Sequence, residues 1–99
     1  SIYYRLVYVY LKHRQDAVVE AAGTEMGTRL RRWFFGRVLG PDKPGISKVK
    51  SLSIRKIVLK FEPGLNMAEV RKYLALAQQQ MLQDKRYSTL QIYFDIDPL

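Results

Sequence analysis

Lysines and tyrosines at strand spacing are the residues of this chain whose pattern could bind a ligand. Four lysines of equal parity lie near the middle of the sequence: Lys48, Lys50, Lys56 and Lys60. An unbroken strand would present all four on one face, with neighbours about 6.6 Å apart, close to the spacing of phosphates along an extended nucleic-acid strand. Four tyrosines are expected to share an open sheet face: Tyr4, Tyr8, Tyr10 and, from the last strand, Tyr93. Tyrosines interleaved with lysines can stack unpaired bases.

The positive charge of the chain is concentrated between residues 29 and 60. This window holds ten basic residues and one acid, Asp42, so it contributes +9 to a formal net charge of +8. A concentrated positive field implies an anionic partner, such as a nucleic-acid backbone or an acidic membrane face. Arg29, Arg31 and Arg32 fall in the last turn of an expected helix, whose dipole favours cations there. Nucleic-acid contact is therefore expected mainly from residues 37–60.

The tyrosines could also occur in these strands for reasons unrelated to nucleic acid. Tyrosine favours β-strands whatever its function, because its ring packs well on a pleated surface. A tyrosine-rich sheet face could also pack against a neighbouring domain. The sequence alone leaves base stacking, strand preference and domain packing open.

The sequence offers little for catalysis. The single histidine, His13, lies in a Lys-His-Arg cluster at a strand end, where we expect a solvated turn residue and not a base. Asp95 and Asp97 share one strand face and could hold a divalent cation, but no third ligand is apparent, so a capping or salt-bridging role is favoured. No Gly-rich phosphate loop or nucleophile motif is present. We expect no catalytic residue and no metal site.

Composition limits the cellular setting. The chain has no cysteine, which excludes disulfides and fits a reducing compartment such as the cytoplasm. No apolar run approaches the roughly 20 residues of a membrane helix, and no signal-peptide pattern opens the chain. Both ends lie close to strand-like runs, so we expect a fragment excised from a longer cytoplasmic protein, with no membrane partner.

The hydrophobic pattern predicts one domain over residues 1–99 with the order β-α-β-β-α-β. Residues 3–11 and 90–96 alternate as strands, residues 37–39 are expected to form at most a brief strand, and residues 46–62 are expected to form one long strand or a bent pair. Helical stripes begin at Asp16 and after Asn66, which has Glu69 three residues on as in a capping box. The second stripe is expected to place five apolar residues on one face: Met67, Val70, Leu74, Ala77 and Met81. The order predicts an α+β fold of ferredoxin-like topology, with a four-stranded antiparallel sheet and two helices on one face.

Several short motifs resemble one known family. They are Arg37-Val38-Leu39-Gly40-Pro41 with Pro44, then Lys48-Val49, the run from Arg55 to Lys60, and the closing Asp95-Ile96-Asp97-Pro98. In this order and spacing the chain resembles the C-terminal domain of primosomal protein N′ (PriA), the bacterial replication-restart DNA helicase. The Tyr-Arg-Leu of residues 4–6 and the Lys-His-Arg of residues 12–14 resemble its Bacteroidetes-type members. The chain has Arg55-Lys56 where many members have Arg-Trp.

The resemblance implies a parent that is an ATP-dependent DNA helicase using ATP, magnesium and zinc, with two motor lobes and a zinc-binding insertion. None of those motor or zinc residues lie in this chain, so it is expected to have no enzymatic activity and no cofactor of its own. The terminal domain of the family resembles ribosomal protein S10 and helps bind DNA. The resemblance places the DNA contacts on the basic surface: Arg37, Lys43, Lys48, Lys50, Arg55, Lys56 and Lys60.

Three hypotheses follow. The chain is expected to be a DNA-binding accessory domain in primosome assembly, gripping forked or single-stranded DNA through phosphates. Alternatively, it is a protein-docking module for the other helicase domains, for the acidic tail of single-stranded DNA-binding protein, or for other primosome proteins. A role with RNA rests only on the ribosomal analogy, which has little functional weight.

Overall fold

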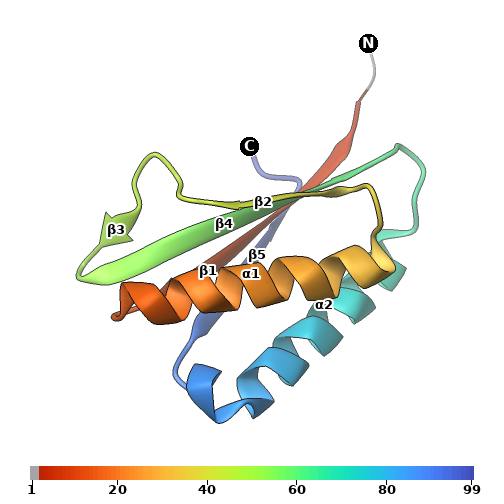
Figure 1. The fold of residues 1–99 in the computed structure, drawn as a ribbon. Coiled ribbons are helices and arrows are strands. Elements are labelled where there is room, and N and C mark those ends of the chain that lie inside the picture. Colours follow the sequence, from red (N-terminus) through yellow and green to blue (C-terminus); the bar gives the residue numbers. More distant parts are fainter. Residues whose placement is uncertain (1–2) are drawn as a thin grey trace.

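The computed structural model of this chain describes residues 3–99, which form an α+β fold. The elements are β1 (Arg5–His13), α1 (Asp16–Trp33), β2 (Val38–Asp42), β3 (Lys48–Val49), β4 (Leu52–Phe61), α2 (Met67–Gln83), the short 3-10 helix η1 (Lys85–Tyr87) and β5 (Gln91–Ile96). Figure 1 shows both long helices on the same side of one sheet. This arrangement leaves the opposite face of the sheet without a covering helix.

The sheet has five strands and not the four expected from the sequence. Its order is β2-β4-β1-β5, and β3 pairs with one end of β4. Every pairing is antiparallel. The four-strand prediction is wrong because residues 46–62 contain two antiparallel strands, β3 and β4, joined by a hairpin turn.

The hairpin turns at Lys50 and Ser51. Both residues have positive φ, 50° and 67°, and they separate Val49 from its cross-strand partner Leu52. Two successive residues of positive φ form the kind of turn whose twist suits antiparallel strands. Asn and Gly normally mark such turns in a sequence, and neither is present here. Because the chain reverses direction at this turn, Lys48 and Lys50 do not belong to the same strand as Lys56 and Lys60. Their even numbers therefore no longer imply that all four lysines share one face.

Alternation along β1 separates a covered face from an open face. Val7, Val9 and Leu11 are fully buried beneath the helices, whereas the side chains between them point to the other side of the sheet.

Helix α2 is capped at its N-terminus by Asn66, whose Oδ1 accepts the N–H of Ala68 at 3.0 Å. The stripe predicted for this helix is buried throughout: Met67, Val70, Leu74, Ala77 and Met81. Burial of these apolar surfaces is the main force that holds the two layers together.

Helix α1 approaches β2 closely at two glycines. Gly23 and Gly27 are one turn apart and both are buried. A Cβ on Gly23 would lie 3.2 Å from Cβ of Pro41, and one on Gly27 would lie 3.4 Å from its Cδ. The absence of side chains at these positions therefore gives Pro41 its space against the helix.

None of the helices in residues 3–99 is both long and apolar enough to cross a bilayer.

Replacing Gly23 with a larger residue should destabilise the protein. In Gly23→Val the added methyl groups would press on Pro41, and such overpacking typically costs about 1–3 kcal/mol. The matched control is Ala21→Val on the exposed side of the same helix. Helix propensity alone would make Gly23→Val the less harmful of the two substitutions, because glycine is a poorer helix former than valine and alanine is a better one. A larger loss of stability in Gly23→Val would come from the overpacking against Pro41. Thermal unfolding should therefore show the larger loss for Gly23→Val, and a larger loss for Ala21→Val would contradict the close packing.

Candidate nucleic-acid interface

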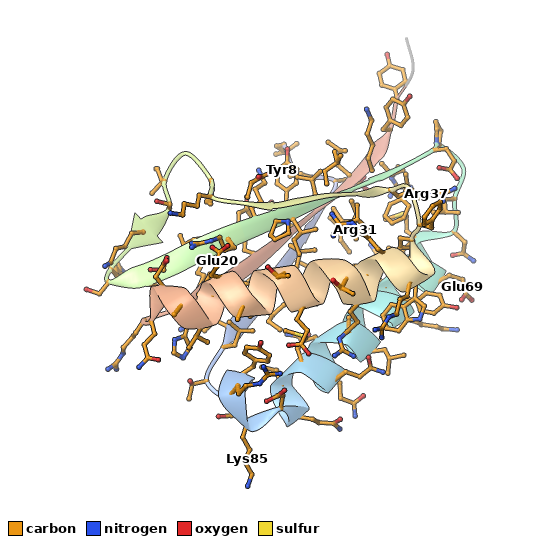
Figure 2. The ribbon with its side chains drawn as sticks, viewed as in Figure 1. Tyr8, Glu20, Arg31, Arg37, Glu69 and Lys85 are labelled. Atoms are coloured by element: carbon orange, nitrogen blue, oxygen red, sulfur yellow. The ribbon has the colours of Figure 1, made fainter. Side chains whose placement is uncertain are left out.

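The open face of the sheet brings the predicted tyrosines together with lysines from two strands. The antiparallel register places Tyr10 of β1 between Lys56 of β4 and Tyr93 of β5. Two residues further along β1, Tyr8 lies between Val58 and Asp95. Residues directly opposite each other in adjacent strands share a face. Figure 2 shows Tyr8 on the side of the sheet away from the helices.

Three lysines of this face lie over tyrosine rings. The Nζ of Lys56 is 3.6 Å from the ring centroid of Tyr8 and 5.7 Å from that of Tyr10. The other two contacts are Lys60 over Tyr4 at 4.0 Å and Lys12 over Tyr93 at 5.2 Å. An ammonium group within about 6 Å of an aromatic centroid is attracted to the ring electrons. We call these seven residues the tyrosine–lysine face: Tyr4, Tyr8, Tyr10, Lys12, Lys56, Lys60 and Tyr93.

The tyrosines differ in how much of each ring a ligand could reach. Tyr4 and Tyr93, at opposite ends of the face, are 47% and 51% exposed. Tyr8 and Tyr10 are half-buried and meet edge to face, with ring centroids 6.3 Å apart and planes at 89°. Tyr4 and Tyr93 are therefore the most accessible positions for base stacking, whereas Tyr8 and Tyr10 pack against each other at the centre of the face.

Three of the predicted DNA-contacting lysines lie outside this face. Lys48 pairs with Ser53, so its side chain shares the side of β4 that faces α1 and not the open side. Lys50 lies in the hairpin turn. Lys43 follows the end of β2 and is near Asp16, the first residue of α1. The prediction that Lys48 and Lys50 share a face with Lys56 and Lys60 is therefore wrong.

Arg55 is buried in an ion-paired site beneath α1, although the sequence motifs predicted a place on the DNA surface. Its side chain is only 4% exposed. Its Nη2 donates to Oδ2 of Asp16 at 3.0 Å, and its Nε donates to Oε2 of Glu20 at 2.8 Å. The hydrogen bond from Arg55 lowers the pKa of Asp16, and the charge of Lys43 adds to this effect. Arg55 ties α1 to β4 and is not on the surface available to a nucleic acid.

Other arginines of the basic window are also paired. Arg37 donates from Nε to Oε2 of Glu62 at 3.0 Å and thereby lowers the pKa of that carboxyl. Arg29 donates to Gln80 on α2 at 2.6 Å. Arg31 donates to the carbonyl oxygen of Gly40. The charge concentration in the sequence is thus distributed over several surfaces, and only Lys56 and Lys60 of the predicted DNA-contacting set lie on the tyrosine–lysine face.

Lys12 belongs to the face but was not predicted as a contact. Its even number gives it the same parity as Tyr8 and Tyr10 in β1, so the alternation of the strand could have identified it.

The tyrosine–lysine face also has acidic neighbours. Asp95 lies opposite Tyr8, and Asp42 lies opposite Lys56. These carboxylates reduce the positive charge near the centre of the face. Its aromatic rings are therefore as important a feature of the surface as its lysines.

Of the residues considered for catalysis or metal binding, His13 and Asp97 make structural contacts, whereas Asp95 forms no ion pair within the described residues. His13 accepts the N–H of Gln15 at Nδ1, 3.0 Å away, and its Nε2 lies 2.8 Å from Oγ1 of Thr89. Asp97 accepts from Nε of Arg5 at 2.9 Å, which confirms the salt-bridging role. Residues 3–99 contain no group of three or more histidine, cysteine, aspartate or glutamate residues that could hold a metal ion.

No protein-family model and no curated protein sequence matches this chain. The likeness to primosomal protein N′ therefore rests on the short motifs alone. Of those motifs, the Arg55–Lys60 run supplies both a buried ion pair and two lysines of the open face. The chemistry of the face itself, aromatic rings beside ammonium groups, is the stronger guide to function.

Acid pH should destabilise the fold, with Asp16 accounting for part of the effect. Arg55 holds the pKa of Asp16 below its usual value. The carboxylate therefore stabilises the folded state above its unfolded pKa of about 3.9, and this contribution is lost as pH falls through the lower folded value. We expect the melting temperature, followed by circular dichroism, to fall below about pH 4 and to fall less steeply in Asp16→Asn.

The matched control for this experiment is Asp95→Asn, which removes an exposed carboxylate that forms no ion pair within the described residues. A fall in Asp16→Asn as steep as in the unaltered protein would contradict the stabilising role of the Asp16–Arg55 pair.

Proposed function

We propose that this chain is a nucleic-acid-binding domain that holds single-stranded DNA on the tyrosine–lysine face. The observation that supports the proposal is the placement of three lysines over tyrosine rings on the helix-free side of the sheet. Open sheet faces with exposed aromatics stack unpaired bases, and neighbouring cations contact the phosphates. Both groups are present here within a few ångströms of each other.

The face suits binding with little sequence preference. Stacking on tyrosine tolerates every base because each base has a flat π-face. Base edges are most often read by amide or guanidinium groups. The arginines of the basic window described above are engaged by carboxylates, an amide and a backbone carbonyl, and the amide of Gln91, which lies opposite Lys12, accepts a hydrogen bond from the hydroxyl of Tyr93. Three lysines that each neutralise one phosphate on a single strand predict a slope of log affinity against log salt of about −2.

We further infer that the fold belongs to the ferredoxin-like, ribosomal S10-like class. The strand order β2-β4-β1-β5 supports this inference if the two-residue β3 is treated as an addition to the edge of the sheet. The position of both helices on one face supports it as well.

We also propose that the chain serves a replication-restart helicase as an accessory domain in the cytoplasm. The support is the order and spacing of the motifs from Arg37 to Pro98 described above. In this proposal the motor domains, with their ATP, magnesium and zinc, lie outside the chain, which itself supplies no enzymatic activity. Forked or single-stranded DNA would be held on the open face while the parent acts on it with single-stranded DNA-binding protein and other primosome proteins.

A second candidate function is protein docking on the helix side. An apolar hollow lies where α1 ends and α2 begins, lined by Trp33, Phe34, Leu65, Val70 and Tyr73 among others. It faces away from the tyrosine–lysine face, so a docked protein domain and a bound DNA strand would not compete. The two candidate functions can therefore be separated by substitutions on opposite sides of the molecule.

Fluorescence anisotropy with a labelled oligothymidylate tests DNA binding. We expect affinity to fall with salt at a slope of about −2. Tyr4→Ala and Tyr93→Ala should each weaken binding by about tenfold, because each removes an exposed stacking ring. The matched control is Tyr73→Leu on α2, a tyrosine that is 39% exposed on the helix side, which should leave DNA affinity unchanged.

Absence of binding at low salt would refute the proposal, as would a flat salt response. Equal weakening by Tyr73→Leu and Tyr93→Ala would place the DNA elsewhere. The same titration with an RNA oligomer addresses the ribosomal analogy, since clearly tighter RNA binding would favour an RNA role.

A further inference from the structure

Three of the lysine–tyrosine contacts are diagonal with respect to the strand register. Lys56 and Lys60 each cover the ring of the residue that lies two positions before their cross-strand partner on β1, namely Tyr8 and Tyr4. Lys12 contacts Tyr93 along the other diagonal, because Tyr93 lies two positions after Gln91, the partner of Lys12 on β5. Such diagonal neighbours are within reach of long and aromatic side chains. In all three contacts the sheet register brings an ammonium group to the ring of a residue two positions from the lysine's cross-strand partner.

The same contacts leave part of each ring occupied. An ammonium group that lies 3.6 Å from the centroid of Tyr8 stands where a stacked base would lie. Within residues 3–99, no carboxylate forms an ion pair with Lys12, Lys56 or Lys60. Asp42 and Asp95 lie on the same face and reduce its positive charge, but the direct contact of each of these ammonium groups is a tyrosine ring. A ligand that displaces one of them from its ring must offer the ammonium group another partner.

Ligands differ in whether they can make this exchange. An unpaired nucleotide brings a flat base for the ring and a phosphate for the displaced ammonium group, so two contacts replace the one that is lost. A duplex brings phosphates, but its bases are stacked within the helix. An aromatic ligand without charge brings a ring but no anion. Only the unpaired nucleotide supplies both groups.

We propose that the lysine–tyrosine pairs make this face selective for unpaired nucleotides by requiring a flat ring and an anion from the same ligand. The inference rests on the proposed binding of single-stranded DNA and adds the means by which the ligand is chosen. Each lysine has two alternative partners, the ring in the unbound protein and a phosphate in the complex.

Two oligothymidylates of equal length test the proposal, one with natural phosphodiester linkages and one with uncharged methylphosphonate linkages. In Lys56→Thr, affinity for the charged oligomer should fall by about fivefold, because a phosphate contact is lost. Affinity for the uncharged oligomer should rise by about two- to fivefold, because its bases no longer compete with an ammonium group for the ring. Lys60→Thr should show the same opposite changes, and its exposed position makes it a second variant that should fold.

The matched control is Lys48→Thr, which removes a strand lysine that shares the helix-side face with Ser53 and should leave affinity for the uncharged oligomer unchanged. If that affinity stays the same or falls in both Lys56→Thr and Lys60→Thr, the exchange is refuted while DNA binding stands. If the unaltered chain binds neither oligomer, the proposed function itself fails.

Discussion

The antiparallel register between β1 and β4 is the constraint on which the tyrosine–lysine face depends. On the covered side, Val9 lies opposite Ile57 and both are fully buried. Because side chains alternate along a strand, this pairing sets Tyr10 opposite Lys56 on the other side. A slip of one residue would expose the buried set and bury the lysines. The packing of the hydrophobic core therefore also determines which residues are neighbours on the opposite, open face of the sheet.

Arginine and lysine take different roles in this molecule. Arg5, Arg37 and Arg55 each contact a carboxylate through two nitrogen atoms or through two partners. The planar guanidinium group suits such contacts because its donors form a rigid fork. Lysine, with a compact and strongly hydrated charge on a flexible stem, remains at the surface. A count of basic residues along the sequence merges these two roles, which is why the charge concentration predicted a larger contact surface than the structure presents.

The alternation of β1 and the apolar stripe of α2 were predictable because buried positions repeat with the period of each element. Arg55 was also predictable in principle, since it has the same parity as the buried Ile57, but its charge suggested a surface position. The hairpin at Lys50 and Ser51 was not predictable, because neither residue type is typical of a turn with positive φ. Nor was the packing role of Gly23, which depends on Pro41 approaching from a distant part of the chain.

The two outer strands of the sheet differ in one respect that bears on self-association. Within β2, Pro41 has no N–H group to offer, and the register shifts between Leu39 and Asp42. Proline and irregular pairing at an outer strand hinder the addition of another strand, which is how many β-proteins avoid aggregation. Strand β5 at the opposite edge contains no proline. A further strand would therefore pair less readily at the β2 edge than at the β5 edge, where the side chain of Gln78 donates to the carbonyl oxygen of Ile92. A strand added at the β5 edge would extend the aromatic surface beyond Tyr93.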